Sequence, residues 1–87
     1  MPKRQLPLRT TTSLPTVSQP PRVLAIELDR EEDGRWIAEV PSLPGVMVYG
    51  QSREEAVSKV QALALRVLAD TIEETGVPQT EVRFAVA

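Results

Sequence analysis

The sequence predicts an α+β domain of two layers, in which a small antiparallel sheet is covered by one long helix. Apolar alternations at residues 23–29, 35–40 and 46–49 are separated by turns rich in Gly and Pro, as in a β-meander. A helical apolar repeat follows over residues 53–75, and a last alternation spans residues 81–86. The predicted order is therefore βββαβ. We assign residues 1–22 to an extended arm and residues 23–87 to a single core domain.

The composition excludes several kinds of chemistry. The chain has no Cys, which rules out disulfides and thiolate nucleophiles, and no His, which removes the commonest general base and metal ligand. No apolar run approaches the roughly 18 residues of a membrane span, and no signal peptide is apparent. We therefore expect a cytoplasmic protein without a cofactor.

Charge is distributed unevenly along the chain. Residues 27–87 hold six basic and twelve acidic residues, whereas residues 1–26 contain no acid and four basic residues, which are Lys3, Arg4, Arg9 and Arg22. An acidic body is poorly suited to strong binding of nucleic acid. It suits a basic protein partner, or a basic arm laid on a neighbouring acidic subunit.

The N-terminal arm contains five prolines within residues 1–21 and shows no helical or strand periodicity. By itself such a segment is extended and weakly ordered. We expect it to pack on its own body or on another chain through four apolar anchors, which are Leu6, Leu8, Leu14 and Val17.

The first two strands form a predicted hairpin. Leu24, Ile26 and Leu28 share one face of the first strand, and Asp33-Gly34 supplies the turn signal before the second. On the second strand, Trp36 shares a face with Ala38 and Val40. We leave open whether Trp36 and Tyr49 are core or interface residues, and we expect Phe84 in the core.

Two prolines and a glycine separate the second strand from the third. Pro41 and Pro44 cannot donate to a ladder, Gly45 tolerates a tight turn, and Gly50 ends the third strand. Both faces of this strand are bulky, which is typical of a strand at a subunit interface. The predicted interface residues are Trp36, Val46, Met47, Val48, Tyr49, Leu6 and Leu8.

The helix has recognisable start and stop signals. Ser52 and Glu55 form a capping box, in which each side chain accepts a hydrogen bond from a backbone amide of the first turn. Gly76 is a natural C-cap, and Pro78 prevents continuation. The apolar stripe comprises Val57, Val60, Ala64, Leu68 and Ile72, widened by Ala56, Leu63 and Val67, with Leu65 and Ala69 off its centre. The last strand either lies parallel to the first or pairs with another subunit.

Residues 36–57 resemble the HicB antitoxin family. The resemblance rests on Pro41-Ser42-Leu43-Pro44-Gly45, on Gly50-Gln51-Ser52 and on Glu54-Glu55-Ala56, and it covers about residues 23–76. It implies a partial ribonuclease H-like fold and binding to HicA, a small ribonuclease toxin. Many HicB proteins continue into a DNA-binding module. We expect this chain to be the core without that module, so the resemblance implies no repressor role.

The carboxylates do not predict a catalytic site. Asp29, Glu31, Glu32 and Asp33 crowd the first hairpin, but their spacing departs from a calcium loop, and a solvated turn explains them better. A ribonuclease H-like site needs clustered carboxylates that hold metal ions, and Asp29 with Glu55 is at best a remnant pair. Ser52 has no evident base and is explained by its cap role. We expect no enzyme activity.

The leading hypothesis is an antitoxin-like protein of a HicA-HicB type II module, which neutralises a small basic ribonuclease by masking it. We expect the protein to be a homodimer or tetramer. The alternatives are a stand-alone oligomeric HicB-like module without a toxin, and an RNA-binding protein that uses the basic arm.

Overall fold

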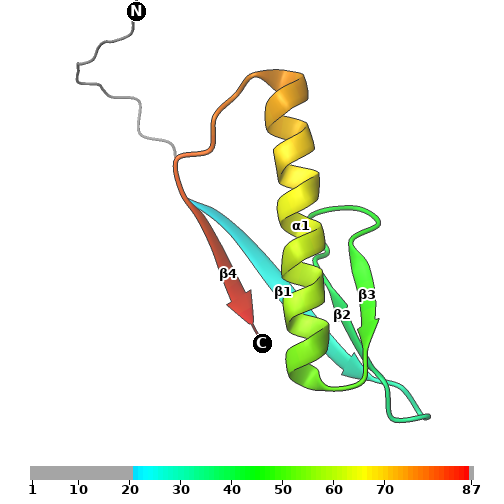
Figure 1. The fold of residues 1–87 in the computed structure, drawn as a ribbon. Helices are drawn as coiled ribbons and strands as arrows, with labels where there is room; N and C mark the ends of the chain where they lie inside the picture. The colour runs from blue at the N-terminus through cyan, green and yellow to red at the C-terminus, as the bar shows by residue number, and fades with distance from the viewer. Residues whose placement is uncertain (1–20, 87) are drawn as a thin grey trace, which may run out of the picture.

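The computed structural model describes residues 21–86. Only the last two positions of the predicted arm, 21 and 22, are among the described residues. All four of its predicted anchors lie outside them. The described elements follow the predicted order, and the α+β class with one long helix is confirmed (Figure 1). They are β1 (Arg22–Arg30), β2 (Trp36–Glu39), β3 (Met47–Gly50), α1 (Arg53–Thr75) and β4 (Val82–Val86).

The four strands form one mixed sheet in the order β3-β2-β1-β4. The pairs β1–β2 and β2–β3 are antiparallel, which confirms the predicted meander. Strand β4 lies parallel to β1, with Leu24 opposite Phe84. The last strand thus pairs within the chain, which is one of the two arrangements that the sequence left open. Strands β3 and β4 form the two edges.

The core lies between α1 and one face of the sheet. Alternation places Leu24 and Ile26 of β1 and Ala38 of β2 on this face, and all three are buried. The helix contributes buried residues at three- and four-residue spacing, as expected for a helix that packs on a sheet. These residues are Ala56, Val60, Ala64 and Leu68. Leu65 and Ala69 are exposed, so the predicted helix face is correct.

The connection between β2 and β3 closes one end of the core. Val40 N–H donates to Val46 O at 3.0 Å, and within this loop Leu43 N–H donates to Val40 O at 3.0 Å. Gly45 has a φ of 84°, as the tight turn required. Leu43 and Val46 are buried, so the turn seals the core as well as reversing the chain.

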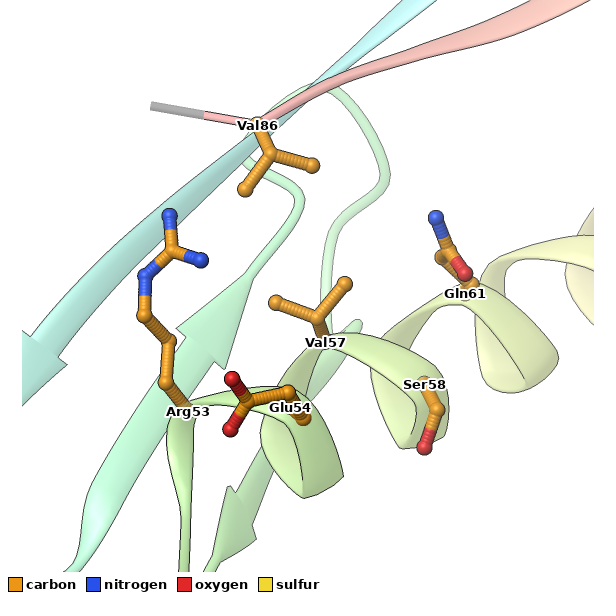
Figure 2. Close-up of a pocket in the computed structure, with 6 residues that line it drawn as sticks. All are labelled: Arg53, Glu54, Val57, Ser58, Gln61 and Val86. Carbon is orange, nitrogen blue, oxygen red and sulfur yellow. The ribbon is translucent and has the colours of Figure 1, made fainter.

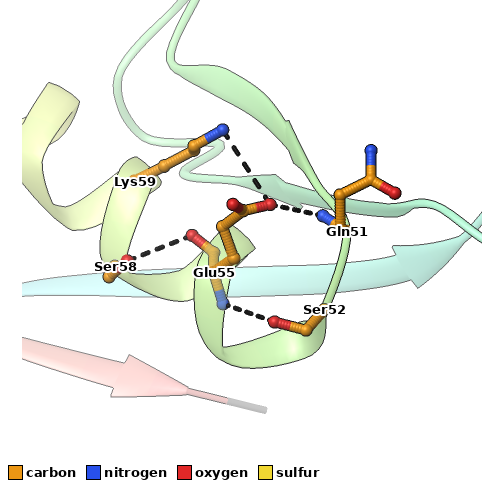
Figure 3. A network of polar contacts seen from close by, with 5 residues as sticks. All are labelled: Gln51, Ser52, Glu55, Ser58 and Lys59. Atoms are coloured by element: carbon orange, nitrogen blue, oxygen red, sulfur yellow. Dashed lines mark hydrogen bonds and ion pairs between the residues drawn. The ribbon is translucent and has the colours of Figure 1, made fainter.

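The helix begins at the predicted cap, with one difference in the hydrogen bonding (Figure 3). Ser52 Oγ accepts from Glu55 N–H at 3.1 Å, as the capping box predicts. The Glu55 carboxylate, however, accepts from Gln51 N–H, one residue before the cap. It therefore holds the end of the β3–α1 connection rather than an amide of the first turn. Lys59 Nζ lies 3.9 Å from the same carboxylate.

Gly50 joins β3 to the helix at very close range. A Cβ at this position would lie 2.6 Å from Ala56 N, a backbone atom that cannot move aside. Ala56 is itself fully buried in the first turn of α1. Gly50 is thus required by the close approach of strand and helix, in addition to its predicted role of ending the strand.

Candidate binding face of the sheet

The side of the sheet opposite α1 carries the best candidate for a binding site. In the described part of the chain, the single helix covers only one side of the sheet (Figure 1). Because side chains alternate along a strand, the residues between the buried positions point to the other side. We call this side the open face; its residues are Val23, Ala25, Glu27, Asp29, Ile37, Glu39, Met47, Tyr49, Arg83 and Ala85.

Two carboxylates oppose each other at the centre of the open face. Glu27 of β1 lies directly opposite Glu39 of β2, and both are exposed. Directly opposed residues on one sheet face have Cβ atoms about 4.5–5.5 Å apart, where like charges destabilise the pairing. No ion pair within residues 21–86 reaches either carboxylate. The centre of this face therefore carries concentrated negative charge that the described residues leave uncompensated.

Apolar side chains flank this acidic pair along the β3 edge. Met47 lies opposite Glu39, and Tyr49 lies opposite Ile37. Met47 and Tyr49 are 48% and 42% exposed, although both are large apolar residues. Asp29 of β1 lies opposite Ile37 of β2, on the other side of Ile37 from Tyr49. An acidic centre beside exposed aromatic and Met side chains is a suitable surface for a protein partner, since aromatic residues and Met are enriched at such interfaces.

We call the exposed side chains of Met47 and Tyr49 the apolar row. Arg35 contacts the Tyr49 end of this row. Its guanidinium lies 4.4 Å from the centroid of the Tyr49 ring, within cation–π range. Asp33 orients it: Arg35 Nε lies 2.8 Å from the Asp33 carboxylate, and Arg35 N–H donates to the same carboxylate at 3.0 Å. The backbone N–H of Arg35 is the main cause that lowers the pKa of Asp33. The hairpin acid and the β3 aromatic are thus linked through one arginine.

The predicted interface residues divide between the two sides of the sheet. Met47 and Tyr49 lie on the open face. Val46 is buried and Val48 is half-buried against the core, so their side chains face the helix. Trp36 is also packed against the core, with the Arg30 guanidinium 5.5 Å from its ring centroid. Leu6 and Leu8 lie outside the described residues.

The acidic hairpin is solvated and engaged in local bonds. Asp29 accepts from Arg30 N–H at 2.8 Å, and Asp33 pairs with Arg35 as described above. Glu31 and Glu32 line a wide, open hollow with their neighbours Arg30 and Asp33. Within residues 21–86, no group of three or more His, Cys, Asp or Glu side chains is placed to hold a metal ion. In particular, no metal cluster of that size includes both Asp29 and Glu55.

The Pro, Gly, Ser and Glu residues that carry the resemblance to HicB have structural roles. Pro41 and Pro44 lie exposed in the loop whose hydrogen bonds close the core, and Gly45 and Gly50 occupy the constrained positions described above. Ser52 and Glu55 are both engaged in capping bonds. The local geometry thus explains this motif through folding, without a binding role.

Comparison with models of known protein families, with curated protein sequences and with solved structures gives no match. Among residues 21–86, no helix is both long and apolar enough to cross a membrane.

Sequence reasoning did not find the Glu27–Glu39 pair or the Arg35–Tyr49 contact. The sequence shows the alternation that points Glu27 and Ile26 to different faces of the first strand. It also shows the Asp33-Gly34 turn. What was lacking is the register of the hairpin, which decides which two side chains face each other. The β1–β2 register, with Asp29 opposite Ile37, would have identified the Glu27–Glu39 pair. The β2–β3 register, with Ile37 opposite Tyr49, would have placed Arg35 near Tyr49.

Proposed function

We propose that this chain is an antitoxin-like binding protein that neutralises a small, basic ribonuclease by covering its RNA-binding surface. The observation that carries the proposal is the exposed Glu27–Glu39 pair beside Met47 and Tyr49. The resemblance of residues 36–57 to HicB supplies the class of partner, a HicA-like toxin.

The charge of the open face supports a basic partner. Bringing Lys or Arg side chains to Glu27 and Glu39 would turn a repulsive pair into an attractive cluster. The same partner would lose the basic surface with which a ribonuclease attracts the phosphates of RNA. Inhibition would then be steric and electrostatic, and would require no chemistry from this chain.

The apolar row would supply most of the contact energy. Burying exposed apolar area contributes about 25 cal/mol per Å², whereas exposed charge pairs mainly guide association and choose the partner. Met47 is a flexible side chain that adapts to a partner surface, and Tyr49 is an aromatic anchor of the kind that dominates such interfaces. Arg35 holds the Tyr49 ring from one side, which reduces the ordering required on binding.

The first test is co-expression of this chain with the product of the neighbouring gene, if that gene encodes a small basic protein, followed by co-purification. The expected result is a stable complex. A matched pair of variants locates the surface: Met47→Asp should abolish co-purification, while Leu65→Asp, which changes an equally exposed residue on α1, should not. Retention of the complex by Met47→Asp would exclude the open face.

A second candidate function is a stand-alone oligomeric module. The observation that favours it is the position of β3 at the sheet edge, where its outer backbone groups pair with no other strand among residues 21–86. Such an edge can pair with a second copy. Light scattering at micromolar concentration tests this candidate: a dimer or tetramer mass supports it, and a monomer mass excludes it.

A further inference from the structure

Strand β4 forms an open edge of the sheet. It pairs with β1 on one side, and among residues 21–86 no strand lies on its other side (Figure 1). Its residues pair with β1 in unbroken register, so the strand contains no bulge, and it contains no Pro or Gly. Bulges, prolines and inward-pointing charges are the usual means by which an edge strand is kept from pairing with another chain. Strand β4 is therefore open to such pairing.

The backbone groups that face outward from β4 belong to Val82, Phe84 and Val86. Arg22 N–H donates to Glu81 O at 2.8 Å, so the Glu81 carbonyl points toward β1. Because backbone groups alternate in direction along a strand, those of Val82, Phe84 and Val86 point away from β1. Each of these three residues carries one N–H donor and one C=O acceptor. We call this row of donors and acceptors the β4 edge.

The same three residues present apolar side chains to the helix layer. The register sets Phe84 beside the buried Leu24, so alternate side chains of β4 share the helix side of the sheet. Helix α1 packs mainly against β2 and β3 and leaves these side chains incompletely covered. Val82 and Phe84 are half-buried, and Val86 is 42% exposed. Figure 2 shows Val86 directed toward Val57 across an open hollow. An exposed apolar strip thus follows the β4 edge.

The charge on β4 is balanced, unlike that of the body as a whole. Residues 27–87 hold six basic and twelve acidic residues, so two copies of this chain repel each other in most orientations. The one charged residue of β4 is Arg83, and its Nε lies 2.6 Å from the carboxylate of Glu81. Because these two charges cancel, a second copy of this chain can approach the β4 edge without net repulsion from the strand.

The order of residues along β4 is symmetric about Phe84. Val82 and Val86 flank it at equal distances, so an antiparallel second copy centred on Phe84 sets Val opposite Val and Phe opposite Phe. The outward donors and acceptors of the two copies then face one another. Centring the pair on Arg83 would instead set two like charges directly opposite, which destabilises the pairing. Centring it on Ala85 would pair only residues 84–86 within β4. The favoured register is therefore the one centred on Phe84.

The other edge of the sheet offers fewer backbone groups. Val40 N–H donates to Val46 O, so the backbone of Val46 faces β2. By the same alternation, the outward-facing residues of β3 are Met47 and Tyr49. The β4 edge has a third such residue, and it also has the apolar strip on the helix side. A second copy therefore gains more hydrogen bonds along β4 than along β3.

We propose that two copies of this chain pair antiparallel along the β4 edge, with Phe84 of one copy opposite Phe84 of the second copy. The two four-stranded sheets become one continuous sheet, with both helices on the same side. Val86 of each copy gains Val82 of the second copy as an apolar neighbour, which α1 does not supply. This inference does not rest on the proposed function, because pairing along β4 leaves the apolar row beside β3 free.

The absence of Cys from the sequence permits a test by disulfide cross-linking. In the proposed register, Arg83 lies opposite Ala85 of the second copy as a non-hydrogen-bonded pair. The Cα atoms of such a pair are about 4.5 Å apart, within the range of a disulfide. An equimolar mixture of Arg83→Cys and Ala85→Cys chains should therefore form covalent dimers under mild oxidation. Each variant alone should form far fewer, because the two identical Cys residues lie diagonally, about 7–8 Å apart.

A matched mixture of Met47→Cys and Tyr49→Cys chains reports on the other edge. These two residues would face each other if β3 paired with a second copy about Val48. This mixture should form no more covalent dimer than either of its variants alone. Absence of cross-linking between positions 83 and 85, equal cross-linking by the single variants, or preferential cross-linking through β3 would each overturn the proposal.

Proline variants test the hydrogen bonds of the β4 edge without a covalent link. Val86→Pro removes an outward N–H that the strand does not use to pair with β1. By symmetry one hydrogen bond is lost at each end of the paired edge, so the dissociation constant of the dimer should rise at least about tenfold. Met47→Pro, at an outward position of the other edge strand, should leave it unchanged. A monomer mass for the unmodified chain in sedimentation equilibrium at micromolar concentration, or equal effects of the two prolines, would contradict pairing along β4.

Discussion

Glu27 of β1 lies directly opposite Glu39 of β2, and both carboxylates are on the side of the sheet away from the helix. Neither has an ion-pair partner within residues 21–86. Opposed like charges lower the stability of the free protein, so this arrangement favours a role in binding over a role in folding. Replacing one of the two carboxylates separates these two roles.

Replacing Glu39 with Gln should stabilise the isolated protein while weakening its binding to a basic partner. We expect a gain of about 0.2–1 kcal/mol in the free energy of unfolding, because the repulsion from Glu27 is removed. Urea unfolding at low and high salt measures it, and the gain should shrink at high salt. Glu32→Gln, in the exposed hairpin, is the control and should change stability little. A destabilised Glu39→Gln protein would show that Glu39 makes a favourable contact.

The helix face predicts a graded series of substitutions. Leu68 is 4% exposed, so Leu68→Ala should cost about 2–5 kcal/mol of unfolding free energy. Leu63→Ala should cost less than Leu68→Ala, because Leu63 is half-buried at the margin of the core. Leu65→Ala should cost the least of the three, since Leu65 is 49% exposed. Equal losses for all three in denaturant melts would mean that the helix is rotated from its described orientation.

Gly50 should tolerate no side chain. Gly50→Ala places a Cβ 2.6 Å from Ala56 N, and relieving this contact requires β3 and α1 to separate. We expect a loss of at least about 1–3 kcal/mol, the usual cost of overpacking. Gln51→Ala changes the adjacent exposed side chain and should alter stability by no more than about 0.5 kcal/mol. Thermal melts of the two variants give the comparison, and similar midpoints would contradict the close approach.

The helix cap should contribute measurably to stability. Ser52→Ala removes the acceptor for Glu55 N–H and should cost about 0.5–2 kcal/mol. Ser58→Ala, by contrast, removes only a hydroxyl that donates to Glu55 O. Loss of that hydroxyl leaves no backbone amide unsatisfied. Ser58→Ala should therefore have the smaller effect in urea unfolding. A larger loss at Ser58 would mean that the Ser52 cap is not formed in solution.

Much of this fold is predictable from the sequence because its signals are local. The capping pair Ser52 and Glu55 and the C-cap Gly76 bound the helix, and they act within one turn of it. Alternation likewise placed Leu24 with Ile26 on one face of the first strand and Ala38 with Val40 on one face of the second, and all four are buried. These features depend on neighbours along the chain, which the sequence displays directly.

The candidate site was less predictable because it depends on contacts between strands. The acidic residues of β1 and β2 were visible individually, but their opposition requires the hairpin register. Bulky residues at positions 46–49 face both sides of the sheet for two different reasons. Val46 and Val48 pack in the core on the helix side, whereas Met47 and Tyr49 are exposed on the open face. Similarly, only the three-dimensional approach of Ala56 to Gly50 reveals why that glycine is needed.

The central claim, that the open face masks a small basic ribonuclease, is tested most directly by an RNA-cleavage assay. The product of the neighbouring gene, where that gene encodes a small basic protein, is incubated with RNA and increasing amounts of this chain. Cleavage should stop near equimolar addition, and the Glu27→Gln, Glu39→Gln double variant should need at least about tenfold more protein, equivalent to about 1.4 kcal/mol of binding energy. Cleavage that continues in excess of this chain, or cleavage by this chain alone with magnesium or manganese, would contradict the account.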